Sequence, residues 1–419
     1  MSPIRKLVSV LGPGLISGAS DDDPSGISTY SVAGASTGYS MLWVILVTTP
    51  MMAVVQGMCA RIALVTGVGL ATAMKRRFAR WLLRPLAVAI ILANTANAGA
   101  DLEGMGASAQ MLFHLPVIIW IAISGVALIA IQVFLSYRQF SSIVKWLTLA
   151  LFGYIVTAFV VHPPWGSVLR HLVTPEVHLT AAWLTTLVGV LGTTITPYMF
   201  FWQAALEVEE QAQRGRTTEE SRRGATREEI ADMHLDVNFG MIFSNLVAFF
   251  IIVTTAATLG AHGMHQISSA QDAARALEPI AGPLASWLFA AGMIGTGLLA
   301  VPAFTASSAY LITEAFGFRE GLAEKAKDAP QFYALIVVGM LMAMTMGLLR
   351  VDPIAALFWC AVINGVVAVP LLAAIVVLAS DKRVMGEWTS SLPARAWGWG
   401  TVAAMGLAAV GMFVFWGQS

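Results

Sequence analysis

The stretch Asp21-Asp22-Asp23-Pro24-Ser25-Gly26 places three consecutive carboxylates inside an otherwise apolar segment of the chain. An ionised side chain at the centre of a membrane helix costs about 2.5–3.5 kcal/mol. Pro24 removes a backbone donor and clashes with the preceding turn, and Gly26 loosens the backbone further. The segment is therefore predicted to be a membrane span that unwinds at this point. The alternative is a loop at the membrane surface, but the span would then end near Ser20 and leave the apolar residues after the break unexplained.

The composition supports a membrane protein, because 57% of the 419 residues are hydrophobic and only 11% are charged. A soluble protein carries roughly 25% charged residues. Cys59 and Cys360 are expected to be small core residues, since both lie in apolar segments. A span needs about 20 mostly apolar residues, and this criterion predicts a single membrane domain (1–419) with eleven transmembrane helices. The predicted spans are 8–36, 40–66, 81–106, 115–136, 143–162, 181–206, 236–260, 281–317, 330–349, 352–379 and 395–417.

The distribution of Lys and Arg sets the expected orientation. With the N-terminus in the cytoplasm, twenty Lys and Arg residues fall on the inner side, and three fall outside, namely Arg170, Arg275 and Arg350. This asymmetry follows the positive-inside rule, and one wrong span would invert every later loop. An odd number of spans then places the C-terminus outside. The charged stretch 207–236 is expected to be a cytoplasmic connector.

A second break is predicted in the sixth span, where Gly192-Thr193-Thr194-Ile195-Thr196 precedes Pro197. Paired interrupted spans in the two halves of a transporter indicate its binding site. Thr196 follows Asp23 by 173 residues. This spacing fits two five-helix repeats, about 8–162 and 181–379, plus one extra helix at 395–417. Because five is an odd number, the second repeat is inverted relative to the first.

Carbonyl oxygens freed by an unwound helix and a nearby carboxylate form a hard oxygen site that suits a cation. Asp23 is the expected charged ligand. Asp21 or Asp22 is expected to cap the half-helix that follows, because aspartate is favoured near a helix N-terminus.

Several short stretches together resemble the NRAMP family of divalent-metal transporters. In this chain, Gly12-Pro13-Gly14 followed by Asp23-Pro24 resembles the first span of that family, and residues 38–43 resemble the start of its second span. Residues 306–316 resemble the eighth span of the family, and residues 370–386 resemble the end of its tenth span. The resemblance implies an all-α polytopic LeuT-type fold in which helices 1 and 6 are broken.

The departures from the family motifs carry functional information. The family has Asp-Pro-Gly-Asn in its first span, whereas this chain has Gly26 in place of the asparagine. It has Met-Pro-His in its sixth span, whereas this chain has Thr196-Pro197-Tyr198, and a second family histidine falls on Gln203. In the third span the family aspartate falls on Ala100, beside Asp101, while Glu103 keeps the family glutamate.

These departures replace soft or bulky ligands with hard, small ones. A methionine sulfur suits transition metals, and a threonine hydroxyl leaves an all-oxygen site. Mg²⁺ dehydrates reluctantly and keeps several waters, so a wider oxygen site suits it. The changes resemble the NRAMP-related magnesium transporter branch, which implies import of Mg²⁺, and also Mn²⁺, by alternating access across a bacterial inner membrane.

The resemblance, taken with the breaks, gives an expected ligand set and an expected aqueous path. The metal ligands are Asp23, Thr196, Gly26, the carbonyls of Ser20 and Thr193, and Asp22, which adds charge or binds a hydrating water. The path is lined by Asp101, Glu103, Gln203, Tyr198 and Asn364, of which Asp101, Glu103 and Asn364 have interhelical hydrogen bonding or packing as the alternative. No histidine falls in the broken spans, so weak or absent proton coupling is expected.

The sequence also allows functions other than the import of Mg²⁺. A proton-coupled Mn²⁺/Fe²⁺ importer is the alternative within the family, and an amino-acid carrier of the same fold is the alternative substrate class. A membrane metal sensor would need a larger soluble output domain. No set of nucleophile, histidine and carboxylate indicates an enzyme. The expected partners are the transported metal ion and the lipid bilayer, without a resident cofactor or nucleic acid, and a monomer is plausible.

Overall fold

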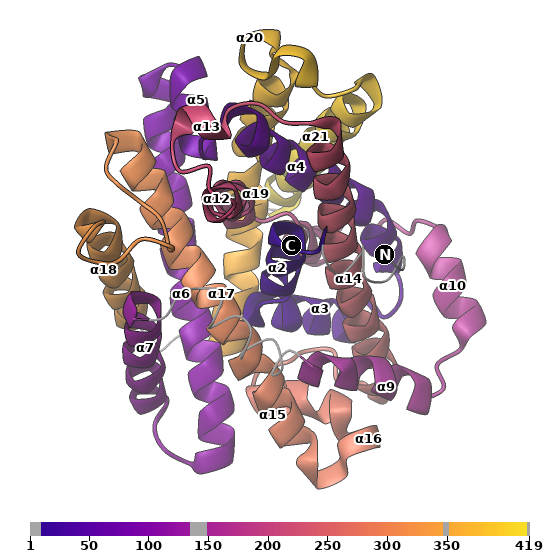
Figure 1. Ribbon diagram of the computed structural model, residues 1–419. Helices are drawn as coiled ribbons and strands as arrows, with labels where there is room; N and C mark the ends of the chain where they lie inside the picture. The colour runs from indigo at the N-terminus through magenta and orange to yellow at the C-terminus, as the bar shows by residue number, and fades with distance from the viewer. Residues whose placement is uncertain (1–9, 135–148, 347–351, 417–419) are drawn as a thin grey trace, which may run out of the picture.

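The computed structural model describes residues 10–134, 149–346 and 352–416, and all regular secondary structure in these ranges is helical (Figure 1). The helices of the first half are α2 (Pro13–Asp21), α3 (Pro24–Thr37), α4 (Leu42–Thr66), α5 (Leu70–Arg77), α6 (Arg80–Phe113), α7 (Val117–Phe134), α9 (Phe152–Val160) and α10 (Trp165–Val173). Those of the second half are α11 (Ala181–Thr194), α12 (Pro197–Gln213), α13 (Glu219–Arg222), α14 (Arg227–Thr258), α15 (Ala270–Ala274), α16 (Glu278–Ala281), α17 (Ala285–Phe316), α18 (Pro330–Met346), α19 (Pro353–Ser380), α20 (Lys382–Met385) and α21 (Leu392–Trp416). Short 3₁₀ turns lie at Leu149–Leu151, Gly260–His262, Arg275–Leu277, Gly282–Leu284 and Gly386–Trp388.

Each of the eleven predicted spans corresponds to a helix or a helix pair. Within the described ranges, eight helical segments are long and apolar enough to cross a membrane, and one of them is the pair α11–α12. The remaining three spans are the pair α2–α3, the short helix α9 and the 17-residue helix α18. The predicted segments 8–9, 135–136, 143–148, 347–349 and 417 lie outside the described residues.

Both predicted helix breaks are present. Asp22 and Asp23 separate α2 from α3, and Ile195 and Thr196 separate α11 from α12. A proline occupies the first position of each second half-helix, where its missing N–H costs nothing because that donor would have no partner within the helix. Pro302 by contrast lies inside the continuous helix α17.

Equivalent helices of the two halves of the bundle pack against each other reciprocally. The broken pair α2–α3 of the first half packs against α14, the second helix of the second half, while α12 packs against α4, the second helix of the first half. The third helices, α6 and α17, pack against each other. Figure 1 places α2, α3 and α12 at the centre of the bundle, inside the long helices α6, α14 and α17. This reciprocal packing is the arrangement expected of two inverted five-helix repeats.

Glycines permit the closest helix contacts around the breaks. A Cβ atom on Gly18 would lie 2.3 Å from the carbonyl oxygen of Gly240, and one on Gly192 would lie 2.0 Å from that of Ala361. Distances this short leave no room for a side chain. The backbone of α2 therefore rests directly on α14, and that of α11 rests on α19.

The start of α2 is fixed by a carboxylate from another helix. Asp236 on α14 accepts hydrogen bonds from the amides of Gly12 (2.9 Å), Gly14 (2.6 Å) and Leu15 (3.0 Å). A helix N-terminus leaves four amides without partners within the helix and carries partial positive charge, so this carboxylate stabilises it on both counts.

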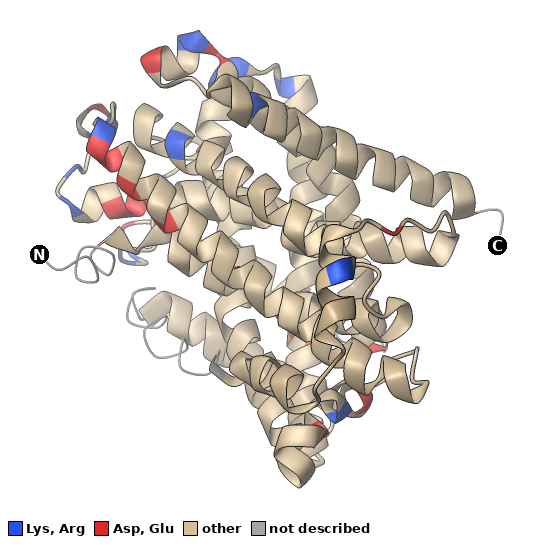
Figure 2. Ribbon diagram, turned by 90° about the vertical axis from the view of Figure 1, so that its right-hand side faces the viewer, with Lys and Arg blue, Asp and Glu red and all other residues tan. Residues whose placement is uncertain are grey.

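Basic residues gather at one end of the bundle (Figure 2). At that end Arg76 of α5 pairs with Glu219 of α13 at 2.7 Å, and Arg77 pairs with Asp381. Arg222 donates to the carbonyl of Gly67 at 2.9 Å, which docks the connector onto the end of α4. The stretch 207–236 is thus partly helical extension of α12 and α14 and partly a folded link between them.

Candidate metal-binding site

Asp23 lies where α3 begins, and its carboxylate caps that helix. Its Oδ1 accepts a hydrogen bond from the amide of Gly26 at 2.5 Å, and the side chain is 2% exposed. Capping by aspartate is favoured because the side-chain oxygen satisfies an amide that has no partner within the helix. The same contact turns the carboxylate toward Gly26 and the neighbouring half-helix α11.

Three oxygens converge on the empty side of Gly26. A Cβ atom there would lie 3.4 Å from Asp23 Oδ1, 3.4 Å from Thr193 Oγ1 and 3.5 Å from the carbonyl oxygen of Asp21. Glycine therefore leaves open the volume between the two breaks. These three oxygens come from both broken spans. Asp23 and Thr193 are among the expected ligands, but the atom expected from Thr193 is its carbonyl, and the Asp21 carbonyl was not expected.

The threonine hydroxyls at the second break are buried and make no hydrogen bond to any described residue. Oγ1 of Thr193 and Oγ1 of Thr196 are both of this kind, and the residues are 1% and 2% exposed. Thr196 is the N-cap residue of α12, yet its side chain does not cap that helix. Buried polar atoms are normally paired, because leaving one unpaired costs about 1–3 kcal/mol. Both hydroxyls are thus available to a ligand.

Both half-helices that precede the breaks end at this point. The last carbonyls of a helix lack partners within it and carry partial negative charge, which favours a cation. The carbonyls of Asp21 at the end of α2 and of Thr193 at the end of α11 belong to this set. Among the described residues, no three His, Cys, Asp or Glu side chains form a metal cluster, so carbonyl and hydroxyl oxygens make up most of the candidate ligands.

Asp101 on α6 approaches the site from the side of α3. It is fully buried, and its carboxylate lies near the Ser25 amide without forming a good hydrogen bond. The carboxylate also interacts with the charge of Asp23. Glu103 lies further along α6, close enough to Asp352 at the start of α19 to interact with its charge. Cys360 on α19 is close enough to Asp101 and Asp23 to interact with their charges. The sequence indicated only a core role for this thiol, because nothing in the pattern of α19 relates it to the acidic break.

Asp21 and Asp22 direct their side chains away from Gly26. The single hydroxyl of Ser244 on α14 lies 2.9 Å from Asp21 Oδ2 and 3.2 Å from Asp22 Oδ1. Neither carboxylate is the N-cap of α3, because Asp23 holds that position. The expectation that one of the two caps α3 is therefore wrong. Asp22 is adjacent to the site along the chain, but its carboxylate faces α14.

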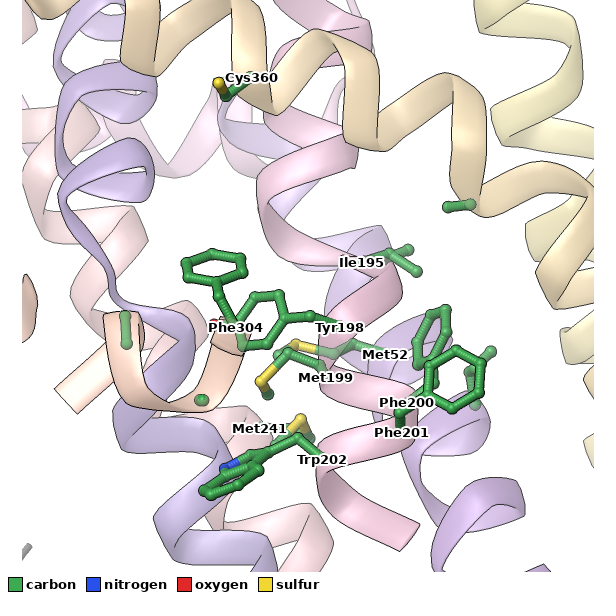
Figure 3. Close-up of a cluster of buried hydrophobic side chains, with 14 of the residues drawn as sticks. Met52, Ile195, Tyr198, Met199, Phe200, Phe201, Trp202, Met241, Phe304 and Cys360 are labelled. Carbon is green, nitrogen blue, oxygen red and sulfur yellow. The ribbon is translucent and has the colours of Figure 1, made fainter. Parts of the chain in front are cut away.

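Tyr198 joins the two breaks on the side facing the basic end. Its hydroxyl donates to the carbonyl of Ser20 at 2.7 Å, and its own carbonyl accepts from Ser307 at 3.2 Å. Its ring packs on Phe304 with centroids 4.0 Å apart. Figure 3 shows Tyr198 and Phe304 above a cluster that includes Met199, Trp202 and Met241. Met199 is fully buried in this apolar cluster.

Two of the expected path residues have side-chain partners. Asn364 and Asn97 exchange two hydrogen bonds of 3.0 Å between α19 and α6, which is the interhelical contact weighed as the alternative for Asn364. Gln203 donates to Glu207 at 3.1 Å, one turn further along α12, while its Oε1 makes no hydrogen bond to a described residue.

A vestibule of about 1440 Å³ opens at the end of the bundle away from the basic end, and Thr186, Val32 and Phe358 lie among its lining residues. One helical turn deeper, a Cβ atom on Gly189 would lie 3.3 Å from the Phe358 ring and 3.4 Å from the methyl group of Thr29. Thr193 and Gly26 lie a further turn along the same helices. Side-chain packing at this level therefore separates the vestibule from the candidate site.

Comparison with known structures supports the fold. The Eremococcus coleocola manganese transporter, solved with an aromatic bis-isothiourea substituted compound, has a TM-score of 0.79 at 18% identity, covering 98% of this chain and 87% of that one. Mhp1, a nucleobase-cation-symport-1 family transporter in a closed conformation, has a TM-score of 0.57 at 13% identity, covering 97% and 90%. The chain thus has the LeuT-like fold of broken-helix transporters.

Sequence comparison identifies relatives and a family. The divalent metal cation transporter MntH of Ralstonia nicotianae is 30% identical over 308 residues, which are 70% of this chain and 66% of that protein, just under two thirds of its length. MntH of Burkholderia ambifaria is 27% identical over 414 residues, covering 96% and 88%. The model of the Nramp family, described as natural resistance-associated macrophage protein-like, matches residues 14–415. Since that match covers nearly the whole chain, the protein belongs to the Nramp family.

Proposed function

We propose that this protein imports divalent metal cations, Mg²⁺ and also Mn²⁺, by alternating access through the site between the two helix breaks. The observation that carries the proposal is the convergence of Asp23, Thr193 and the Asp21 carbonyl on the open volume at Gly26. The relatives named divalent metal cation transporters support the substrate class.

The ligand chemistry favours a hard ion that keeps part of its hydration. Asp23 supplies a carboxylate, Thr196 and Thr193 supply hydroxyls, and the ends of α2 and α11 supply carbonyls, including that of Ser20. Mg²⁺ prefers oxygen ligands in octahedral geometry and retains water, so it is bound by one or two carboxylates rather than by a complete protein cage. The space left by Gly26 accommodates such waters. Asp22, whose carboxylate faces α14, contributes negative charge at a distance.

Asp101 and Glu103 supply further negative charge along α6, and they line the proposed path together with Gln203, Tyr198 and Asn364. A negatively charged cavity concentrates cations and repels the carboxylate of an amino acid. The charge therefore argues against an amino-acid carrier, although that substrate class shares the fold.

The basic end of the bundle faces the cytoplasm in this proposal, because Lys and Arg flank spans on that side of a bacterial membrane. The vestibule then opens to the outside. Transport is proposed to proceed without tight proton coupling, because no histidine lies in α2, α3, α11 or α12.

Uptake into proteoliposomes tests the function. The wild-type protein is expected to accumulate Mn²⁺, and Mg²⁺ at millimolar concentration is expected both to enter and to compete. A pH-sensitive dye inside the vesicles is expected to show no acidification that follows metal entry. Mn²⁺ uptake with no Mg²⁺ entry or competition, together with such acidification, would assign the protein instead to the proton-coupled Mn²⁺/Fe²⁺ class.

A further inference from the structure

A second cavity, separate from the metal site, lies at the basic end of the bundle. It has a volume of about 670 Å³ and is bounded by α5, α6, α12 and α17. Volumes of this size are typical of sites for small organic ligands. Apolar side chains such as Leu86, Ile90 and Leu311 form most of its wall.

The polar side chains among the described residues that line this cavity are three cations, Lys75, Arg80 and Arg84. All three are exposed, and Lys75 donates to the carbonyl of Ala315 at 2.6 Å, which holds it at the rim. Arg80 and Arg84 are four residues apart on α6, so they lie on the same helix face, one turn from each other. The lining contributes no carboxylate to neutralise these cations.

The surrounding surface has the character of a membrane boundary. Trp81 is 76% exposed beside the two arginines, and Val88 and Leu92, further along α6, are 56% and 59% exposed. Tryptophan is enriched where headgroups meet the hydrocarbon, and a run of exposed aliphatic side chains on a membrane helix faces the hydrocarbon itself. The arginines therefore lie at headgroup depth, and the apolar wall of the cavity lies at acyl-chain depth.

We propose that this cavity binds an anionic phospholipid, with the phosphate between Arg80 and Arg84 and an acyl chain against Leu86 and Leu311. Charge complementarity selects the ligand, because cations at the rim and an apolar interior match a phosphodiester attached to a hydrocarbon tail. Basic pockets between transmembrane helices are known to bind acidic headgroups. Phe201, which lines the cavity from α12, is one turn from Pro197 at the second break, so a bound chain contacts the half-helix that carries Thr196.

Native mass spectrometry of the purified protein with phosphatidylglycerol or phosphatidylcholine tests this site directly. The wild type is expected to retain phosphatidylglycerol in preference to phosphatidylcholine. Replacing both arginines (Arg80→Gln with Arg84→Gln) is expected to weaken phosphatidylglycerol binding about twenty-five-fold, because each cation near the headgroups contributes a factor of about five.

Two matched variants separate the site from general charge effects. Arg227→Gln removes an exposed cation at the first residue of α14, away from the cavity, and is expected to leave binding unchanged. Ala87→Trp fills the cavity and keeps both arginines, and it is expected to reduce binding of the tail. The proposal is wrong if the double variant binds phosphatidylglycerol as the wild type does, or if Arg227→Gln weakens binding equally. Because the readout is lipid binding and not transport, it does not depend on the identity of the transported ion.

Discussion

The hydroxyl of Tyr198 donates a 2.7 Å hydrogen bond to the carbonyl of Ser20, and this contact links the first helix break to the second. Ser20 belongs to the last turn of α2, while Tyr198 belongs to the first turn of α12. A carbonyl oxygen has two lone pairs, so Ser20 can accept this bond and still face a cation. The contact therefore closes the site on the side of the basic end without removing a candidate ligand.

Tyr198→Phe is expected to loosen this closure. A neutral hydrogen bond contributes about 0.5–1.5 kcal/mol, so its loss shifts the ratio of open to closed states about two- to twelve-fold. Rates of metal efflux from preloaded proteoliposomes are expected to rise. Tyr333→Phe is the control, because it removes a 2.9 Å hydrogen bond from a tyrosine hydroxyl to the backbone carbonyl of Glu324, away from both breaks. Equal efflux from the two variants would contradict a gating role for Tyr198.

Asp23→Asn separates the charge of this residue from its role as a helix cap. Asparagine caps a helix about as well as aspartate, so the fold and α3 are expected to be retained. Metal uptake is expected to fall to background, because the ligand that lies against Gly26 loses its charge. Circular dichroism and gel filtration check folding, and isothermal titration with Mn²⁺ measures binding. A folded variant that binds Mn²⁺ as the wild type does would remove Asp23 from the site.

Gly26→Ala is expected to change the preference among metals rather than the fold. Its Cβ would contact Asp23 Oδ1 and Thr193 Oγ1 at 3.4 Å, which is ordinary van der Waals distance but occupies the space for water on a hydrated ion. Uptake of Mg²⁺ is expected to fall more than that of Mn²⁺, which loses its waters more readily.

Gly34→Ala is the control for Gly26→Ala, because it disturbs helix packing away from the proposed ligands. A Cβ there would lie 2.1 Å from Thr255 Oγ1 and 2.4 Å from the carbonyl of Ile252, so α3 and α14 must move apart. This variant is expected to lower the unfolding temperature while its folded fraction keeps the wild-type ratio of Mg²⁺ to Mn²⁺ uptake. An unchanged ratio in Gly26→Ala would show that Gly26 does not set the width of the site.

Glu320, in the loop after α17, is expected to make stability depend on pH. Burial and the neighbouring Glu314 raise the pKa of Glu320 to about 9, and the hydroxyl of Thr313 hydrogen-bonds to its carboxyl group. Since the folded state favours the protonated form, this contribution to stability is complete below the unfolded pKa of about 4.3 and is lost as the pH rises toward 9.

Thermal unfolding across this pH range measures the effect. Glu320→Gln mimics the protonated form, so its stability relative to the wild type is expected to increase steadily from pH 5 to pH 9. Glu278→Gln, at an exposed position, is expected to show no such trend. Parallel pH profiles for the wild type and Glu320→Gln would contradict the assignment.

Cys360→Ala tests whether the site uses only oxygen ligands. The thiol lies within electrostatic reach of Asp101 and Asp23, and no pattern in the sequence indicates that a soft donor lies this near the proposed ligands. Because the proposed site relies on oxygens, uptake of Mg²⁺ and Mn²⁺ is expected to be unchanged. A selective loss of Mn²⁺ uptake would show that sulfur takes part in metal binding.

The breaks and span order could be predicted because they follow from local rules. Asp21–Pro24 and Gly192–Pro197 each combine a proline with carboxylates or glycine inside a long apolar run, and this combination favours unwinding. Proline alone does not mark a break, since Pro302 lies inside the continuous helix α17. The direction of individual side chains could not be predicted in this way. Asp22 and Asp23 are adjacent in sequence, yet one faces Ser244 on α14 and the other faces Gly26, because tertiary packing decides which side of the unwound segment each carboxylate occupies.

Contacts between elements that are distant in the chain also could not be predicted from the sequence. Asp236 caps α2 from 224 residues away in the chain, measured to Gly12, and the bond from Tyr198 to Ser20 spans 178 residues. No local pattern encodes such pairs. For Asn364 the sequence left both a path-lining role and interhelical packing open, and only the position of Asn97 on α6 shows which partner its amide has.

The most direct test of the account is the anomalous scattering of Mn²⁺ in crystals of the protein grown with that ion. The predicted result is one peak between the two breaks, within about 2.5 Å of the Asp23 carboxylate and accompanied by ordered waters on the side of Gly26. Adding excess Mg²⁺ is predicted to remove the peak. A peak that persists in excess Mg²⁺, or one that lies away from Asp23 and the Thr193–Thr196 segment, would contradict the central claim.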